Sequence, residues 1–143
     1  MKKIFINLPV EDLDKSMKFY ARLGFTNNAL FSGENQKCMV WSEHIYVMLQ
    51  SKAFFNTHNR KQFVDSKNNI ASSFTLPVDS LAILNDIIEN GLNSGGTEPT
   101  PMIDEGFMQV RTIEDLDGHT WAIIYLDEIK YEEFKGKNST QNK

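Results

Sequence analysis

Three histidines and one cysteine are the side chains of this 143-residue chain best suited to ligate a metal or act in catalysis. His44 lies beside Glu43 in an expected turn and His58 in a polar stretch, so we expect both at the surface. His119 follows a predicted hairpin glycine and is expected to have a structural role. No two histidines have the i, i+4 or similarly short spacing of a shared metal site. Cys38 lies in the apolar run CMVW, which favours a buried, unreactive thiol.

Arg111 lies on a predicted strand, where its guanidinium would be able to hold a ligand carboxylate or phosphate. An ion pair with Glu114 or Asp115 is the alternative, which we favour. The loop at Gly95-Gly96 lacks the Lys-Ser/Thr of a phosphate cradle, so nucleotide binding is not indicated.

The elements that must position these side chains occur twice along the chain. An alternating apolar strand runs into Leu8-Pro9-Val10, and a second copy runs into Leu76-Pro77-Val78. Each copy continues into an amphipathic helix that ends near a glycine, Gly24 or Gly91, and three strand candidates follow. Such a restart indicates a duplicated module. The predicted order is strand, helix and three strands, taken twice.

Local signals predict where these elements begin and end. Pro9 is expected to end the first strand, because proline cannot donate to a ladder. Asp12 and Asp79 are expected to cap the two helices. Residues 25–32 are predicted as a strand, and Asp117-Gly118 between two apolar runs predicts a β-hairpin.

The predicted fold class is α+β, in one domain that spans residues 1–127. Its two modules take up about residues 1–51 and 70–127. The polar connector 52–69 is expected to contain a short helix and would be able to act as a lid. Residues 128–143 are expected to form a polar tail, disordered in its final GKNSTQNK.

Composition limits the kinds of partner. Hydrophobic residues make up 41% and charged residues 24% of the chain, as in ordinary globular proteins. The net charge of −4 gives no basic field to attract nucleic acid or an anionic membrane. No apolar run approaches the ~20 residues of a membrane span, and the N-terminus has a strand pattern rather than that of a signal peptide. The single cysteine excludes an internal disulfide, so we expect a cytoplasmic protein.

The stretches LPVEDLDKSMKFYARLGF and DLDGHTWAIIYLD, with the paired strand–helix openings, resemble the vicinal oxygen chelate superfamily. Its members include glyoxalase I, extradiol dioxygenases, fosfomycin-modifying enzymes and bleomycin-binding resistance proteins. The resemblance covers residues 2–127. It implies two βαβββ modules whose curved mixed sheets enclose a cavity, often in a homodimer. It does not fix the function, because this fold hosts several chemistries.

The resemblance also implies where a divalent metal would be held by His, Gln or Glu side chains. The four matching positions here carry Phe5, Met48, Ser73 and Ala122. None of these offers the imidazole or carboxylate that such a metal needs, and only Tyr46 and Gln50 offer a donor nearby. We therefore expect no metal and no other cofactor, and we assign no catalytic residue.

Side-chain alternation predicts which residues face the implied cavity. These aromatic, apolar and uncharged polar groups suit a small amphiphilic ligand, although they would equally complete a filled core. The predicted ligand-binding residues are Phe5, Asn7, Trp41, Tyr46, Met48, Gln50, Ser73, Thr75, Phe107, Arg111 and Ala122. Trp41 and Phe107 would stack on an aromatic ligand, as bleomycin-binding relatives do with theirs, or would pack in the core.

Three functions remain open on the sequence. The preferred one is metal-independent binding of a small organic ligand in the inter-sheet cavity of a homodimer. The second is an enzyme of lyase or dioxygenase type with a displaced metal or none. The third is an interaction protein whose cavity is filled.

Overall fold

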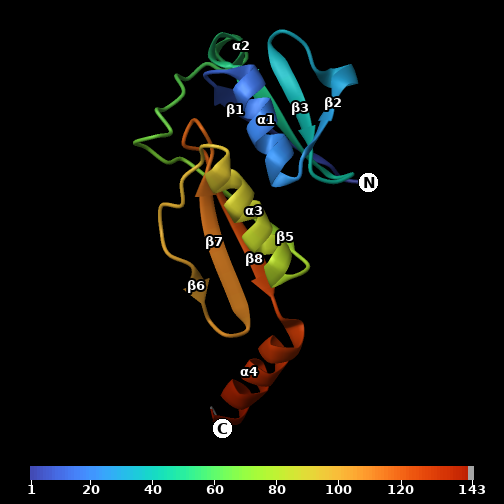
Figure 1. The fold of residues 1–143 in the computed structure, drawn as a ribbon, viewed down its shortest axis with the longest axis vertical. Helices are drawn as coiled ribbons and strands as arrows, with labels where there is room; N and C mark the ends of the chain where they lie inside the picture. The colour runs from blue at the N-terminus through green and yellow to red at the C-terminus, as the bar shows by residue number, and fades with distance from the viewer. Residues whose placement is uncertain (142–143) are drawn as a thin grey trace.

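The computed structural model describes residues 1–141, with the side chains of residues 1–137, and has two four-stranded mixed sheets (Figure 1). The first module consists of β1 (Ile4–Val10), α1 (Leu13–Leu23), β2 (Thr26–Asn28), β3 (Gln36–Val40) and β4 (Ile45–Ser51), with sheet order β1-β4-β3-β2. The second consists of β5 (Ser73–Val78), α3 (Leu81–Asn93), β6 (Ile103–Asp104), β7 (Met108–Glu114) and β8 (Thr120–Leu126), with order β5-β8-β7-β6. In each sheet the first strand pairs in parallel with the last. The predicted α+β fold of two βαβββ modules is confirmed.

Local chemistry explains the ends of the first helix. The Asp12 side chain accepts a hydrogen bond from the Lys15 amide at 3.0 Å. Gly24 follows the helix at φ 116°, a conformation that residues with a Cβ rarely adopt. Both predictions for α1 are confirmed. The cap of α3 is Ser80, not Asp79, because the Ser80 hydroxyl is the group that reaches the Ile83 amide.

Two strand predictions need correction. Pro9 does not end β1, which continues to Val10; β1 is an edge strand paired only with β4, so a missing N–H on its outer side is tolerated. Residues 25–32 form a strand only over Thr26–Asn28. The next three residues form a 3₁₀ turn, whose Leu30 amide donates to the Asn28 side chain at 3.1 Å.

The segments outside the modules are partly helical. The connector begins with the expected short helix, α2 (Lys52–Thr57). The expectation of a disordered tail is wrong as far as Gln141, because α4 spans Glu128–Gln141; residues 142–143 lie outside the described residues. Rings of Tyr131 and Phe134 pack on Phe107 at centroid distances of 5.4 and 4.7 Å, and this contact anchors α4 to the second sheet. No helix of the described residues is long and apolar enough to cross a bilayer.

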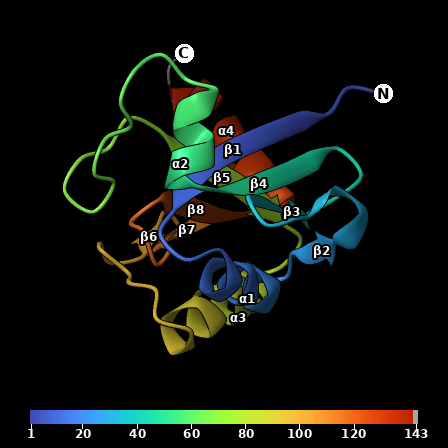
Figure 2. The same ribbon diagram turned by 90° about the horizontal axis from the view of Figure 1, so that it is seen from above.

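The two modules pack together within one chain. Helices α1 and α3 lie side by side on the same side of the strands (Figure 2). Beneath them one core draws on both modules and includes Tyr20, Leu49, Ile88, Ile113 and Trp121. One face of each sheet is therefore buried under a helix, and the other face is left for the site.

A buried polar network joins α1 to the β7–β8 hairpin. The Tyr20 hydroxyl donates to Asp115 Oδ2 at 2.6 Å and accepts from Trp121 Nε1 at 2.9 Å. His119 Nε2 lies 2.7 Å from the Pro9 carbonyl, which can only accept, so this nitrogen carries the proton. Burial raises the pKa of the Asp115 carboxyl, although its hydrogen bonds oppose that shift. The expected structural role of His119 fits this contact.

Candidate functional site

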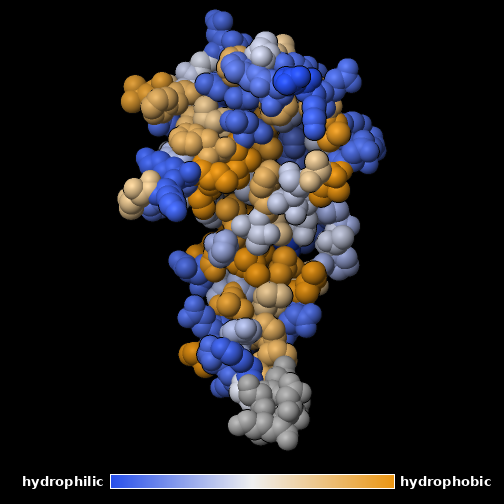
Figure 3. Space-filling model, turned by 180° about the vertical axis from the view of Figure 1, so that it is seen from behind, coloured by the Kyte–Doolittle hydropathy of each residue, from blue (hydrophilic) through white to orange (hydrophobic). Residues whose placement is uncertain are grey.

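The face of each sheet turned away from α1 and α3 is called the open face below. Strand register places Phe5 beside Tyr46, Asn7 beside Met48, and Thr75 beside Ala122. The residues that alternate with them along the strands belong to the core; they include Leu8, Val47, Leu49, Leu76 and Ile123. The side chains of the register pairs named above must therefore point away from the core. The open faces carry Phe5, Asn7, Tyr46, Met48, Gln50, Ser73, Thr75, Thr120, Ala122 and Ile124. Figure 3 shows this side of the molecule, where apolar side chains gather along its middle.

An aromatic pair dominates the open face of the first sheet. The rings of Phe5 and Tyr46 stack at 4.6 Å with 12° between their planes. Phe5 is nevertheless 53% exposed. The Tyr46 hydroxyl donates to the Glu43 carbonyl at 2.9 Å, which fixes the ring, and Lys3 Nζ lies 5.5 Å from the Tyr46 ring centroid. The pair forms a rigid platform on which a planar ligand or a second protein surface would stack.

The centre of the same face is apolar and more covered. Met48 and Cys38 lie opposite each other on β4 and β3, and both are buried. Burial raises the pKa of the Cys38 thiol, as expected for an unreactive cysteine. Gln50 Nε2 donates to Gln36 Oε1 at 3.2 Å, so part of its amide is already engaged.

The residues at the four metal positions do not fit a divalent cation. Phe5, Met48, Ser73 and Ala122 all lie on the open faces, where the resemblance implies that a metal would be held. None of them has an imidazole or a carboxylate. Over residues 1–137, no three His, Cys, Asp or Glu side chains come together in a group that would hold a metal ion.

Two predicted aromatic site residues are not brought to the open faces. Trp41 packs against Phe25 with ring centroids 5.0 Å apart and joins the edge of the core. Phe107 packs against α4. Trp41 therefore follows the core-packing alternative, whereas Phe107 packs on α4, a contact that neither alternative included.

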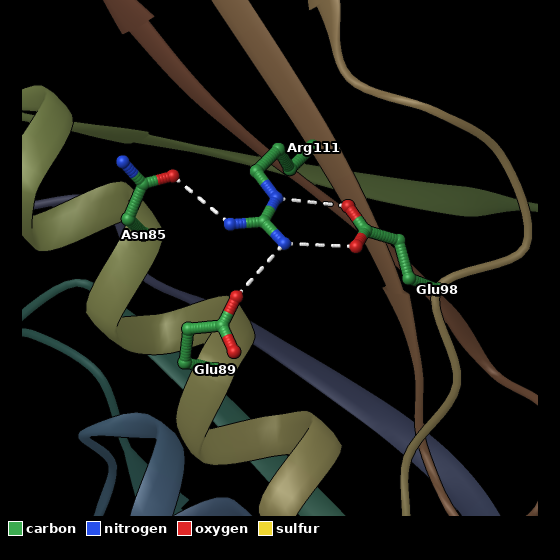
Figure 4. A network of polar contacts seen from close by, with 4 residues as sticks. All are labelled: Asn85, Glu89, Glu98 and Arg111. Carbon is green, nitrogen blue, oxygen red and sulfur yellow. Dashed lines mark hydrogen bonds and ion pairs between the residues drawn. The ribbon is translucent and has the colours of Figure 1, made fainter.

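Arg111 is likewise not brought to the open faces (Figure 4). It pairs with the core residue Ile123 on β8, so strand alternation points it toward α3. Its Nε and Nη2 each donate to a Glu98 oxygen at 2.8 Å, and its remaining bonds go to Asn85 and Glu89. The expected ion pair with Glu114 or Asp115 is therefore wrong.

The Arg111–Glu98 pair is closely coupled. Arg111 lowers the pKa of the Glu98 carboxyl, and Glu98 in turn raises the pKa of the guanidinium. With both glutamates and Asn85 engaged, Arg111 stabilises the packing of α3 on β7 and has little left to offer a ligand.

The other two histidines differ in exposure. His58 is exposed, as expected. His44 is half-buried, with its Nε2 3.3 Å from the Met1 sulfur. Neither lies among the open-face residues.

One hollow in the molecule was not among the sites predicted from the sequence, which assigned the connector only the role of a lid. A cavity of about 340 Å³ lies under the connector, between the edges of the two sheets. Of the predicted site residues, Asn7 lines it. Its outer wall comes from residues 55–72, and beyond the end of α2 at Thr57 this segment has no helix or strand periodicity to reveal its orientation, so sequence patterns could not have found the cavity.

Comparisons with known proteins agree with this architecture. Residues 2–41 match a family model described as bleomycin resistance protein-like N-terminal. A hypothetical protein from S. aureus has a TM-score of 0.73 at 21% identity, over 87% of this chain and 94% of its own. A glyoxalase/bleomycin resistance protein/dioxygenase family enzyme from Burkholderia phytofirmans PsJN has a TM-score of 0.72 at 10% identity, over 88% and 99%. The fold is that of the vicinal oxygen chelate superfamily.

A third structure extends the same result. A glyoxalase-related enzyme from Fulvimarina pelagi superposes with a TM-score of 0.71 at 17% identity, over 87% of this chain and 88% of that one. Among curated proteins, none has significant sequence similarity to the chain. At these identities the likeness establishes the vicinal oxygen chelate fold, and the function has to be argued from the open faces.

Proposed function

We propose that this protein binds a small, largely apolar organic molecule without a bound metal ion, in a cleft between open sheet faces. The observation that carries the proposal is the exposed Phe5–Tyr46 platform. The 53% exposed Phe5 ring continues into the stacked Tyr46 ring, and a contiguous apolar patch on a sheet face is typical of a surface that a ligand or partner covers. The uncharged polar groups of Asn7, Ser73 and Thr75 would orient the ligand.

The second wall of this cleft is proposed to come from a second copy of the chain. Within one chain the sheets share the helical core, and their open faces are not packed against each other. In a homodimer, the open face of the first sheet would lie against the open face of the second sheet from the partner. A reducing compartment such as the cytoplasm suits the buried, unpaired Cys38.

Metal analysis separates this proposal from the enzyme alternative. Protein purified without chelator is offered Zn²⁺, Ni²⁺, Fe²⁺ and Mn²⁺, and the ion content per chain is measured. The proposal expects no ion above the background of a chelator-treated sample. About one tightly held ion per chain would overturn it and favour lyase or dioxygenase chemistry with a displaced site.

Ligand binding is tested by thermal shift and calorimetry with an apolar naphthalene dye and neutral aromatic fragments. Phe5→Ala is expected to weaken binding of any hit about tenfold, because removing one aromatic stacking partner costs roughly 1–2 kcal/mol. Phe31→Ala is the matched control, since Phe31 is 65% exposed but lies on the 3₁₀ turn. An equal loss of affinity in both variants, or no binding by the wild type, would refute the proposal. Either result would favour an interaction protein whose cavity is filled.

A further inference from the structure

The cavity of about 340 Å³ under the connector, called the connector cavity below, is separate from the Phe5–Tyr46 platform. It is lined by parts of residues 7–9, 55–74 and 118–120, so it lies where the edge strands β1 and β5 approach the β7–β8 hairpin. A volume of this size is in the range of small-molecule sites. It belongs to a single chain and needs no partner to complete it.

The outer wall of the connector cavity is held by several independent contacts. The Asp65 carboxylate accepts from the Lys67 amide at 3.0 Å and from Asn68 Nδ2 at 2.7 Å, which closes a tight turn. At the start of the connector, Lys52 Nζ forms an ion pair with Glu11 at 2.7 Å. The His119–Pro9 hydrogen bond fixes the floor between the two modules. The cavity is therefore built into the fold rather than left by a loose loop.

Apolar side chains form much of the lining and reach its mouth. The rings of Phe55 and Phe63 contact each other edge-on at 6.1 Å between centroids, and Phe74 also belongs to the lining. Val64 is 48% exposed and Ile70 68% exposed. If these side chains covered an apolar ligand, their apolar surface would be removed from water, which lowers the free energy of the complex.

The polar part of the lining has a single sign of charge. Among its residues Lys61 is a cation, and none is Asp or Glu. The side chains of Lys61, Asn7, Gln62 and Thr120 make no hydrogen bond or ion pair with any residue in the range 1–137. A cavity with aromatic walls, free amides and one unpaired ammonium is complementary to an apolar anion.

We propose that the connector cavity is a second ligand site, which binds small aromatic carboxylates. Phe55, Phe63 and Phe74 would enclose the ring, Lys61 would pair with the carboxylate, and Asn7 would donate to it. The inference does not depend on the proposed function at the open faces, because it shares only Asn7 with the residues proposed to bind ligand there and needs a single chain.

Titration of the ¹⁵N-labelled full chain with phenylacetate, and separately with phenylacetamide, tests both the place and the charge. Phenylacetate is expected to shift the backbone amides of residues 61–72 and 118–120. The neutral amide is expected to bind about three- to fivefold more weakly, as suits one exposed ion pair. Shifts confined to β1 and β4 around Phe5 and Tyr46, or none in the cavity segments, would overturn the proposed site.

Two variants test the assignment of roles. Lys61→Met is expected to remove the preference for phenylacetate over phenylacetamide, while Lys2→Met, at another exposed lysine that is outside the lining, retains it. Phe63→Ala is expected to weaken both probes, because it removes a wall without changing the charge. An unchanged preference in Lys61→Met would overturn the anionic class of ligand, and unchanged affinities in Phe63→Ala would overturn the cavity as the binding place.

Discussion

Gly118 provides a direct test of how firmly the connector is seated on the hairpin. Its φ is +88°, and a Cβ added there would lie 2.5 Å from the Ser66 carbonyl oxygen and 2.8 Å from the Lys67 nitrogen. These are backbone atoms, so they cannot rotate out of the way. Gly118→Ala must therefore displace the connector as well as adopt a strained conformation.

The magnitude follows from a matched control. Gly106 has a similar φ of +82°, but a Cβ there would meet nothing within 4 Å. Gly106→Ala therefore carries the conformational cost alone, about 1–2 kcal/mol. Gly118→Ala adds roughly 1–3 kcal/mol for overpacking, a total of about 2–5 kcal/mol. At about 3 °C per kcal/mol for a domain of this length, the Tm is expected to fall by about 3–6 °C in Gly106→Ala and about 6–15 °C in Gly118→Ala.

The assay combines thermal unfolding with hydrogen exchange of the connector amides. In Gly118→Ala, exchange is expected to accelerate in residues 62–70 before the strands are affected, since the clash falls on the connector. Equal losses of Tm in the two variants, or unchanged exchange of the connector, would refute the view that the connector is a fixed wall packed on Gly118.

Two further predictions concern the polar networks. Tyr20→Phe is expected to lower the free energy of unfolding, measured by urea unfolding, by about 2–4 kcal/mol, because Asp115 Oδ2 and Trp121 Nε1 each lose a buried partner. In the wild type, the lowered pKa of Glu98 stabilises the fold above the ordinary glutamate pKa, and this stability is lost as pH falls through the lowered value. Arg111→Met is expected to reduce the loss of stability between pH 7 and pH 3 by about 1 kcal/mol, measured by urea unfolding at both pH values.

The Tyr20→Phe prediction has a matched control, and each of the two predictions has an outcome that would contradict it. Tyr125→Phe removes a hydroxyl for which the described residues supply no hydrogen bond, so its effect on unfolding should stay within about 0.5 kcal/mol. A Tyr20→Phe effect equally small would show that the buried network does not hold the modules together. An unaltered pH dependence in Arg111→Met would show that the Glu98 pair is not what depresses that carboxyl's pKa.

What the sequence could predict was mostly local. Asp12 and Gly24 act within one turn of their own helix, and the Asp117-Gly118 hairpin joins strands adjacent in sequence. Strand alternation likewise assigned Phe5 and Tyr46 correctly to one face. These features depend on a residue and its near neighbours, which the sequence displays directly.

The features that the sequence analysis predicted wrongly or missed depend on contacts between distant segments. Arg111 is held by Glu98 and α3, and no local pattern chooses these partners over Glu114. The polar segment after residue 127 forms a helix, whose Tyr131 and Phe134 rings pack against Phe107. The connector cavity exists because residues 55–72 fold back across the hairpin. In all three cases tertiary packing decided between conformations that the local sequence left open.

Because of the way the modules are joined, ligand affinity should depend on protein concentration at one proposed site and not at the other. The Tyr20–Asp115–Trp121 network and the shared helical core hold both sheets in one arrangement within a chain. A cleft that uses two open faces must therefore take its second wall from another copy, so its ligand affinity should weaken when the protein is diluted below the dimer dissociation constant. Affinity at the connector cavity should be independent of dilution, because all of its walls come from one chain. Calorimetry of the same probe at two widely different protein concentrations distinguishes the two sites without any mutation.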